Sequence, residues 1–182
     1  MCSAQLGCHV PDDAGCGQAL SRRGSLTLKD DANAARDQLI WKWKGAAAVA
    51  VADFGDPITS SAYALCVLER PGGTPGVKLL ASVPAGGDCG GRPCWRLAKG
   101  GFRYVDSSAA QDGIRSVQLK AGVAGRAKAT MKGKGANFAM PPLGLAPPVT
   151  ARLVRVGTAR CWEATFSTPT RNDATMFKAR SD

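Results

Sequence analysis

The stretch Leu39-Ile40-Trp41-Lys42-Trp43-Lys44 is the clearest β-strand pattern in this chain. Side chains alternate between the two faces of a strand, so both tryptophans share one face with Leu39 and both lysines share the other. A shared apolar face in a sheet usually packs against a hydrophobic core, whereas lysines need solvent. The stretch therefore predicts a strand whose sheet covers the core with one face only.

The same alternation, or a short apolar run, recurs between turns that are rich in glycine and proline. The 182 residues include 22 glycines and 11 prolines, and the only helical pattern is one or two turns within residues 32–38. About nine short strands with such turns indicate an all-β fold, an antiparallel β-sandwich, with a β-barrel as the alternative. Besides 39–44, the predicted strands are 25–29, 62–69, 77–83, 95–98, 102–105, 114–120, 126–132, 149–156 and 160–167.

Residues 1–19 differ from the rest of the chain. They carry three cysteines and show no hydrophobic periodicity. We expect a cysteine-containing extension or linker at 1–19 and a single sandwich domain at 20–182. A chain of 182 residues is long enough for one domain with a core and too short for two of ordinary size.

The seven cysteines favour disulfides over zinc, because none forms a CxxC pair and the chain has one histidine, His9. Disulfides imply an oxidising compartment, so we expect an exported protein that is periplasmic, extracellular or on the cell surface. Cys66 and Cys161 lie in strong apolar strands, and Cys89 and Cys94 flank one glycine-rich loop. We therefore expect the bonds Cys66–Cys161 and Cys89–Cys94, with Cys66–Cys94 as the main alternative.

An odd number of cysteines leaves one without an intramolecular partner. Cys2 follows the first methionine, and three roles stay open for it: a lipid anchor, an intermolecular disulfide, or a bond to Cys8 or Cys16. The first residues show no basic region followed by an apolar stretch, so we expect any signal peptide to have been removed. The longest apolar run is far short of the ~20 residues of a membrane helix, and no transmembrane segment is predicted.

Several strings in the chain resemble an uncharacterised group of exported, mainly proteobacterial proteins. They are Trp41-Lys42-Trp43-Lys44, Asp53-Phe54-Gly55-Asp56-Pro57, Leu65-Cys66, Pro84-Ala85-Gly86-Gly87, Lys132-Gly133-Lys134-Gly135 and Cys161-Trp162-Glu163-Ala164-Thr165-Phe166-Ser167. The resemblance covers roughly residues 25–180 and implies export and an all-β domain. It implies no activity, site or cofactor.

Candidate catalytic groups are few. His9 lies in the irregular extension, so a structural or exposed role is favoured over a catalytic triad. The two glutamates, Glu69 and Glu163, would be needed for a glycosidase that uses paired carboxylates. Asp53 and Asp56 are weak calcium candidates, and we favour the alternative that these carboxylates bond backbone amides in a turn. No cofactor or metal is predicted.

Positive charge points to an anionic partner. Lys plus Arg exceed Asp plus Glu by 24 to 14, a net charge of +10. Nucleic acid does not fit an exported protein with disulfides, so we expect an acidic polysaccharide or a cell-envelope polymer instead. The ligand-binding candidates are the cations of one predicted hairpin, Lys120, Arg126, Lys128, Lys132 and Lys134, and an exposed aromatic platform of Trp95 and Tyr104.

These observations predict a secreted or surface-anchored, non-enzymatic module that binds carbohydrate or an anionic envelope polymer. The alternative is a structural or assembly subunit of an extracellular structure, in which strands pair with neighbouring copies. A third hypothesis is a hydrolase without a familiar motif.

Overall fold

The computed structural model describes residues 8, 15–70, 73 and 76–182. Within them, the chain forms thirteen strands and two short 3-10 helices, η1 (Ala34–Arg36) and η2 (Val51–Phe54). One sheet has the order β1-β11-β10-β4-β5. Its strands are β1 (Gly17–Gln18), β4 (Tyr63–Glu69), β5 (Gly76–Val83), β10 (Val149–Arg155) and β11 (Cys161–Phe166).

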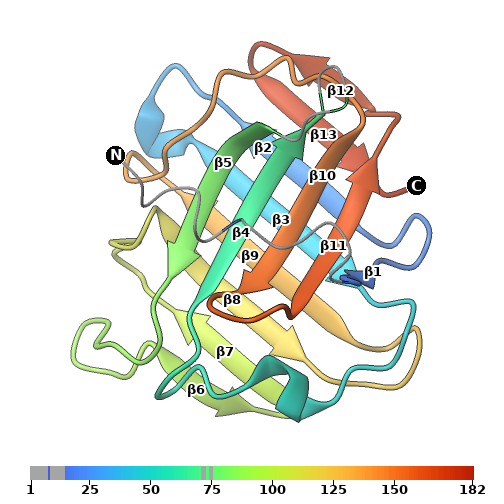
Figure 1. The fold of residues 1–182 in the computed structure, drawn as a ribbon. Helices are drawn as coiled ribbons and strands as arrows, with labels where there is room; N and C mark the ends of the chain where they lie inside the picture. Colours follow the sequence, from blue (N-terminus) through green and yellow to red (C-terminus); the bar gives the residue numbers. More distant parts are fainter. Residues whose placement is uncertain (1–7, 9–14, 71–72, 74–75) are drawn as a thin grey trace.

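The second sheet has the order β12-β13-β2-β3-β9-β8-β7-β6. Its strands are β2 (Ser25–Lys29), β3 (Gln38–Lys44), β6 (Trp95–Ala98), β7 (Gly101–Val105), β8 (Ile114–Lys120), β9 (Lys128–Lys134), β12 (Arg171–Asp173) and β13 (Met176–Arg180). The two sheets pack face to face with the core between them, and the five-stranded sheet lies in front in Figure 1. The predicted β-sandwich is confirmed.

Strand β3 has the alternation that the sequence predicts. Trp41 and Trp43 are buried and belong to the core, whereas Lys42 is exposed on the outer face. The indole N–H of Trp43 donates to the backbone oxygens of Gly17 and Glu163, both at 3.1 Å. Trp43 therefore ties β3 of one sheet to β1 and β11 of the other.

Three short strands were missing from the sequence prediction. Strands β12 and β13 form a hairpin beside β2, and only Phe177 and Ala179 of this hairpin are buried. Strand β1 pairs with β11 in parallel, the exception to the predicted antiparallel pairing. These strands carry too few apolar residues to produce a period that the sequence alone could show.

The predicted bond Cys66–Cys161 is wrong, and Cys89–Cys94 is confirmed. The structure has the disulfides Cys8–Cys66, Cys16–Cys161 and Cys89–Cys94. Cys66 lies in β4 and Cys161 in β11, and β10 separates these two strands. Strands lie about 4.8 Å apart, so two spacings exceed the Cα separation that a disulfide bridges.

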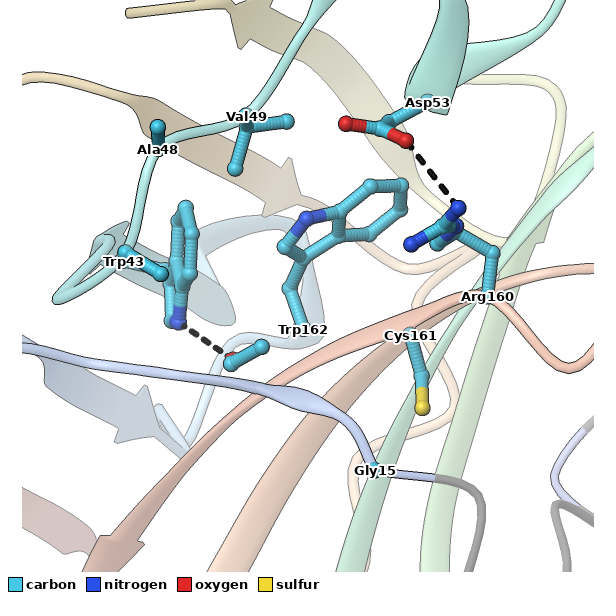
Figure 2. Close-up of a pocket in the computed structure, with 10 residues that line it drawn as sticks. Gly15, Trp43, Ala48, Val49, Asp53, Arg160, Cys161 and Trp162 are labelled. Atoms are coloured by element: carbon cyan, nitrogen blue, oxygen red, sulfur yellow. Dashed lines mark hydrogen bonds and ion pairs between the residues drawn. The ribbon is translucent and has the colours of Figure 1, made fainter. Parts of the chain in front are cut away.

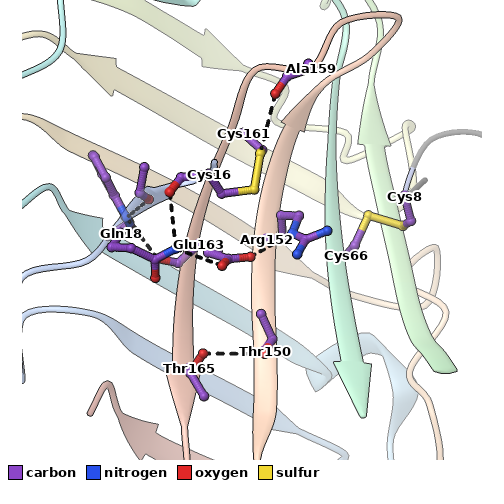
Figure 3. A network of polar contacts seen from close by, with 12 residues as sticks. Cys8, Cys16, Gln18, Cys66, Thr150, Arg152, Ala159, Cys161, Glu163 and Thr165 are labelled. Carbon is purple, nitrogen blue, oxygen red and sulfur yellow. Dashed lines mark hydrogen bonds and ion pairs between the residues drawn. A yellow bond between two sulfur atoms is a disulfide. The ribbon is translucent and has the colours of Figure 1, made fainter. Parts of the chain in front are cut away.

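Both cysteines instead point to the outer face of the five-stranded sheet, where each bonds a cysteine of the N-terminal segment (Figure 3). A small buried cluster forms there around Cys8, Cys66 and Cys161, with Ala64, Leu68 and Val154. Cys2 and His9 lie outside the described residues, so the predictions for the odd cysteine and for His9 stay predictions. No helix in the described ranges has the length and apolar character needed to cross a membrane.

Candidate functional site

The outward positions of β8 and β9 carry the cations predicted from the sequence. Lys120 in β8 and Lys128, Lys132 and Lys134 in β9 alternate with buried residues, and all four are exposed. The inward neighbours belong to the core, which directs every second side chain to solvent. Arg126 lies in the turn between the two strands and is also exposed. The structure thus brings the predicted basic hairpin together as one surface.

Three lysines stand directly opposite one another across three neighbouring strands. Lys44 of β3 pairs with Lys128 of β9, and Lys128 pairs with Lys120 of β8. Directly opposite residues have Cβ atoms about 5 Å apart, and like charges at that spacing destabilise a sheet. Among the described residues, none of these lysines forms an ion pair. We call Lys44, Lys128 and Lys120 the lysine row.

Like charges also face each other elsewhere on this sheet. Arg96 of β6 stands opposite Arg103 of β7, and Arg171 of β12 stands opposite Lys178 of β13. Arg171 is compensated by Asp173 at 2.6 Å, and this hydrogen bond holds the pKa of Asp173 well below its usual range. We define the basic face as the outward cations of the eight-stranded sheet: Lys29, Lys42, Lys44, Arg96, Arg103, Lys120, Lys128, Lys132, Lys134, Arg171, Lys178 and Arg180.

Only part of the basic face could be found from the sequence. The alternation in 39–44 does place Lys42 and Lys44 outward, but it does not say which strand lies beside them. Strand β3 pairs with β9, although more than eighty residues separate these two strands in the sequence. This pairing completes the lysine row. The arginines of β6 and β7 were missed because a single Arg in a short strand is no signal by itself.

The predicted aromatic platform is wrong. Trp95 and Tyr104 do pair across β6 and β7, but both side chains are buried. Their rings contact each other with centroids 5.3 Å apart, and Trp95 also contacts Tyr63 at 5.7 Å. The indole N–H of Trp95 donates to Pro84 O at 2.8 Å. The loop that follows β5 and includes Pro84 thus covers this end of the sheet, and the two rings belong to the core.

Burial also changes the ionisation of both tyrosines. Loss of water contact raises the pKa of Tyr104 to about 12, and the charge of nearby Asp106 adds to this effect. Burial raises the pKa of Tyr63 as well, against a smaller opposing effect of Arg155. The Tyr63 hydroxyl donates to the backbone oxygen of Phe54. Both phenols are neutral structural groups, and neither is available to a ligand.

Charges on the outer face of the five-stranded sheet are compensated, whereas on the basic face only Lys29 and Arg171 pair with a carboxylate among the described residues. Arg152 is buried and its Nε lies 2.7 Å from Glu163 Oε2, while the Gln18 amide donates to Glu163 Oε1 at 2.8 Å (Figure 3). Glu69 is also buried, accepts from the backbone N–H of Ala146 at 2.7 Å, and pairs with a lysine. The two glutamates considered for a paired-carboxylate mechanism are therefore both held in structural contacts.

A pocket of about 170 Å³ lies between the ends of the two sheets (Figure 2). Its walls include Trp43, Val49 and Trp162, and the ion pair of Arg160 Nη2 with Asp53 Oδ1 at 3.1 Å lies at its side. Both tryptophans are only 2% exposed, so little of either ring is open to a ligand. The pocket is also smaller than the few hundred Å³ of common ligand sites.

The weak calcium candidates behave as turn residues. Asp53 Oδ2 accepts from the backbone N–H of Ala50 at 2.8 Å, at the start of η2. Asp56 accepts from the N–H of Ile58 at 3.0 Å and from the hydroxyl of Thr59 at 2.7 Å. In the part of the chain that the structure describes, no three His, Cys, Asp or Glu side chains gather as a metal site would require.

Comparisons with protein-family models, with curated proteins and with solved structures gave no match.

Proposed function

We propose that this protein is an exported, non-enzymatic module that binds an acidic polysaccharide or an anionic cell-envelope polymer through the basic face. The lysine row carries the proposal. Three like charges in register lower the stability of a sheet, and a bound polyanion relieves their repulsion. An extended polymer lying across β3, β9 and β8 would meet one cation of the row in each strand.

The disulfides support an acidic glycan over nucleic acid as the polyanion. Three disulfides fit an oxidising compartment outside the cytoplasm, where envelope polymers and secreted polysaccharides occur. The resemblance to a group of exported bacterial proteins agrees with this location. A net charge of +10 favours association with any polyanion at low ionic strength, so ligand competition must establish the class.

The test is retention of the protein on immobilised polygalacturonate over a series of salt concentrations. The parent should be retained at low salt and released as salt rises, because the Debye length falls to ~10 Å at 0.1 M. The triple variant Lys128→Gln, Lys132→Gln and Lys134→Gln should bind about tenfold more weakly, since three exposed charge contacts contribute about 0.5 kcal/mol each. Its melting temperature should stay close to that of the parent.

A matched control carries the same change in net charge on loops outside the strands that carry the basic face. Arg23→Gln, Arg36→Gln and Arg92→Gln replace three exposed arginines outside the strands of the eight-stranded sheet. This control should bind the polymer nearly as the parent does. Equal weakening of both triple variants would mean that only net charge matters, and tighter binding of DNA than of every acidic polysaccharide would contradict the proposed ligand class.

The alternative of an assembly subunit has less support. Strand β5 is a long edge strand, but Asp112 accepts from both the backbone N–H and the hydroxyl of Ser82, each at 2.8 Å. This contact occupies part of the edge that a neighbouring copy would need for strand pairing. Size-exclusion chromatography with and without reductant tests the alternative, which requires a stable oligomer.

A further inference from the structure

One end of the sandwich combines exposed apolar side chains with cations. We define the loop end as residues 18–20, 44–52, 96–101 and 119–128. Hydrogen bonds join these segments: Leu20 N–H donates to Lys44 O, Val49 and Gly122 exchange two bonds, and Ala121 N–H donates to Gly100 O. The loop after β3 and the turn after β8 run side by side at the lower right of Figure 1.

Four large apolar residues of the loop end are exposed. Leu97 is 75% exposed and Val123 is 70% exposed, with Val51 and Leu20 next at 42% and 38%. Two other large apolar residues in the described part of the chain are as exposed as these last two, Val77 and Val156. The loop end also presents the exposed run 46–48, which is three alanines. The four residues lie on segments that hydrogen bonds join to one another, and exposed apolar side chains on neighbouring segments are typical of an interaction site.

All the charged side chains of the loop end are positive. Its segments contain no aspartate or glutamate, and Asp53, the next residue of η2, is paired with Arg160. They contain six cations, which are Lys44, Arg96, Lys99, Lys120, Arg126 and Lys128. A partner that fits must therefore offer both an apolar phase and negative charge. A polysaccharide offers negative charge but no hydrocarbon layer that Leu97 and Val123 could enter. A membrane surface with anionic lipids offers both the negative charge and the hydrocarbon layer.

We propose that the loop end docks on a membrane surface that contains anionic lipids. Leu97 and Val123 enter the boundary between headgroups and acyl chains, and Lys99, Lys120 and Arg126 meet the lipid phosphates. Each Lys or Arg near such a surface strengthens binding roughly fivefold. The loop end shares Lys44, Lys120 and Lys128 with the basic face, but docking differs from polymer binding because it also depends on apolar side chains that a sugar polymer does not use.

The test is co-sedimentation with vesicles of phosphatidylcholine alone or of phosphatidylcholine with phosphatidylglycerol. The parent should sediment with the mixed vesicles and stay in solution with phosphatidylcholine alone. The double variant Leu97→Gln and Val123→Gln keeps every charge and should bind the mixed vesicles about tenfold more weakly, because two apolar side chains no longer enter the boundary. Both positions are exposed, so its melting temperature should match that of the parent.

The control variant is Val77→Gln, which replaces an exposed valine of β5 outside the loop end. It should sediment like the parent. Failure of the parent to bind mixed vesicles, or equal binding by the double variant, would overturn the proposal. Retention on polygalacturonate separates the two functions, because the double variant should be retained like the parent. A parent that binds the polymer and no vesicle refutes the docking proposal alone.

Discussion

Replacing Cys16 and Cys161 together by alanine removes the crosslink that closes the largest loop of the three disulfides. The two cysteines are 145 residues apart, and loop-closure entropy predicts a loss of about 5 kcal/mol for a loop of that size. For a chain of this length, each kcal/mol lowers the melting temperature by about 2–4 °C, so we expect a fall of about 10–20 °C. Strand β1, which has two residues beside β11, would lose its covalent support.

The matched control is removal of Cys89–Cys94, whose partners are 5 residues apart. The same relation gives about 2 kcal/mol for this short loop, or a fall of about 4–8 °C. The assay is thermal unfolding followed by circular dichroism in non-reducing buffer, after peptide mapping of the parent has identified the bonds. The reasoning would be refuted if the melting temperature of the Cys16 and Cys161 variant fell no further than that of the control. The pairing would be refuted if peptide mapping found Cys66 bonded to Cys161.

Three further perturbations test the packing and the ionisation of the core. Gly101→Ala should destabilise the protein by about 3 kcal/mol, since its Cβ would lie 2.0 Å from Leu119 O, whereas Gly76→Ala, with its nearest neighbour at 4.0 Å, should change the urea midpoint little. Stability should fall above about pH 10, because burial raises the pKa of Tyr104 to about 12 in the folded protein. The neutral phenol stabilises the fold fully below the pKa of the unfolded state, and this contribution is lost as the pH rises toward 12. The variant Tyr104→Phe should flatten this decline in urea titrations. Stability should also fall below about pH 4, because hydrogen bonds from a serine hydroxyl and backbone amides together outweigh the effect of burial and lower the pKa of Asp106. The ionised carboxylate stabilises the fold above the pKa of the unfolded state, and this contribution disappears as the pH falls through the lower pKa of the folded state. The variant Asp106→Asn should flatten the acid side of the stability profile.

Strands with clear alternation or a continuous apolar run were predictable from the sequence. The range 25–29 for β2 and the range 114–120 for β8 match the structure, and β3 differs from 39–44 by one residue. Their inward residues form one core, which makes the local pattern and the global fold agree. Strand β9 was predicted two residues too early, because Arg126 and Ala127 belong to the preceding turn.

The partners of Cys66 and Cys161 and the burial of the aromatic pair could not be predicted, because they depend on strand order and on loops, whereas Cys89–Cys94 closes one local loop. Cys66 and Cys161 are both in apolar strands, as the sequence indicates, but β10 lies between those strands and the N-terminal segment supplies the partners. Trp95 and Tyr104 pair as expected, yet the loop that includes Pro84 covers them. A local pattern gives the period of a strand, and it does not say what lies above either face.

Only part of the basic face was predictable, because the rest depends on which strands lie side by side. The cations of the 114–134 hairpin were recognised from their density in the sequence. The lysine row needed the pairing of β3 with β9, a contact between distant segments that alternation cannot supply. The like-charge repulsion that supports the proposed function therefore emerges only when the sheet is assembled.

The most direct test of polymer binding by the basic face is lysine footprinting. The protein is acylated at low salt with and without polygalacturonate, and the modified lysines are quantified by mass spectrometry. The account predicts protection of Lys44, Lys120 and Lys128 by the polymer, with unchanged modification of Lys78, which pairs with Glu69 on the five-stranded sheet. Undiminished acylation of the lysine row in the bound state, or equal protection of Lys78, would contradict the account.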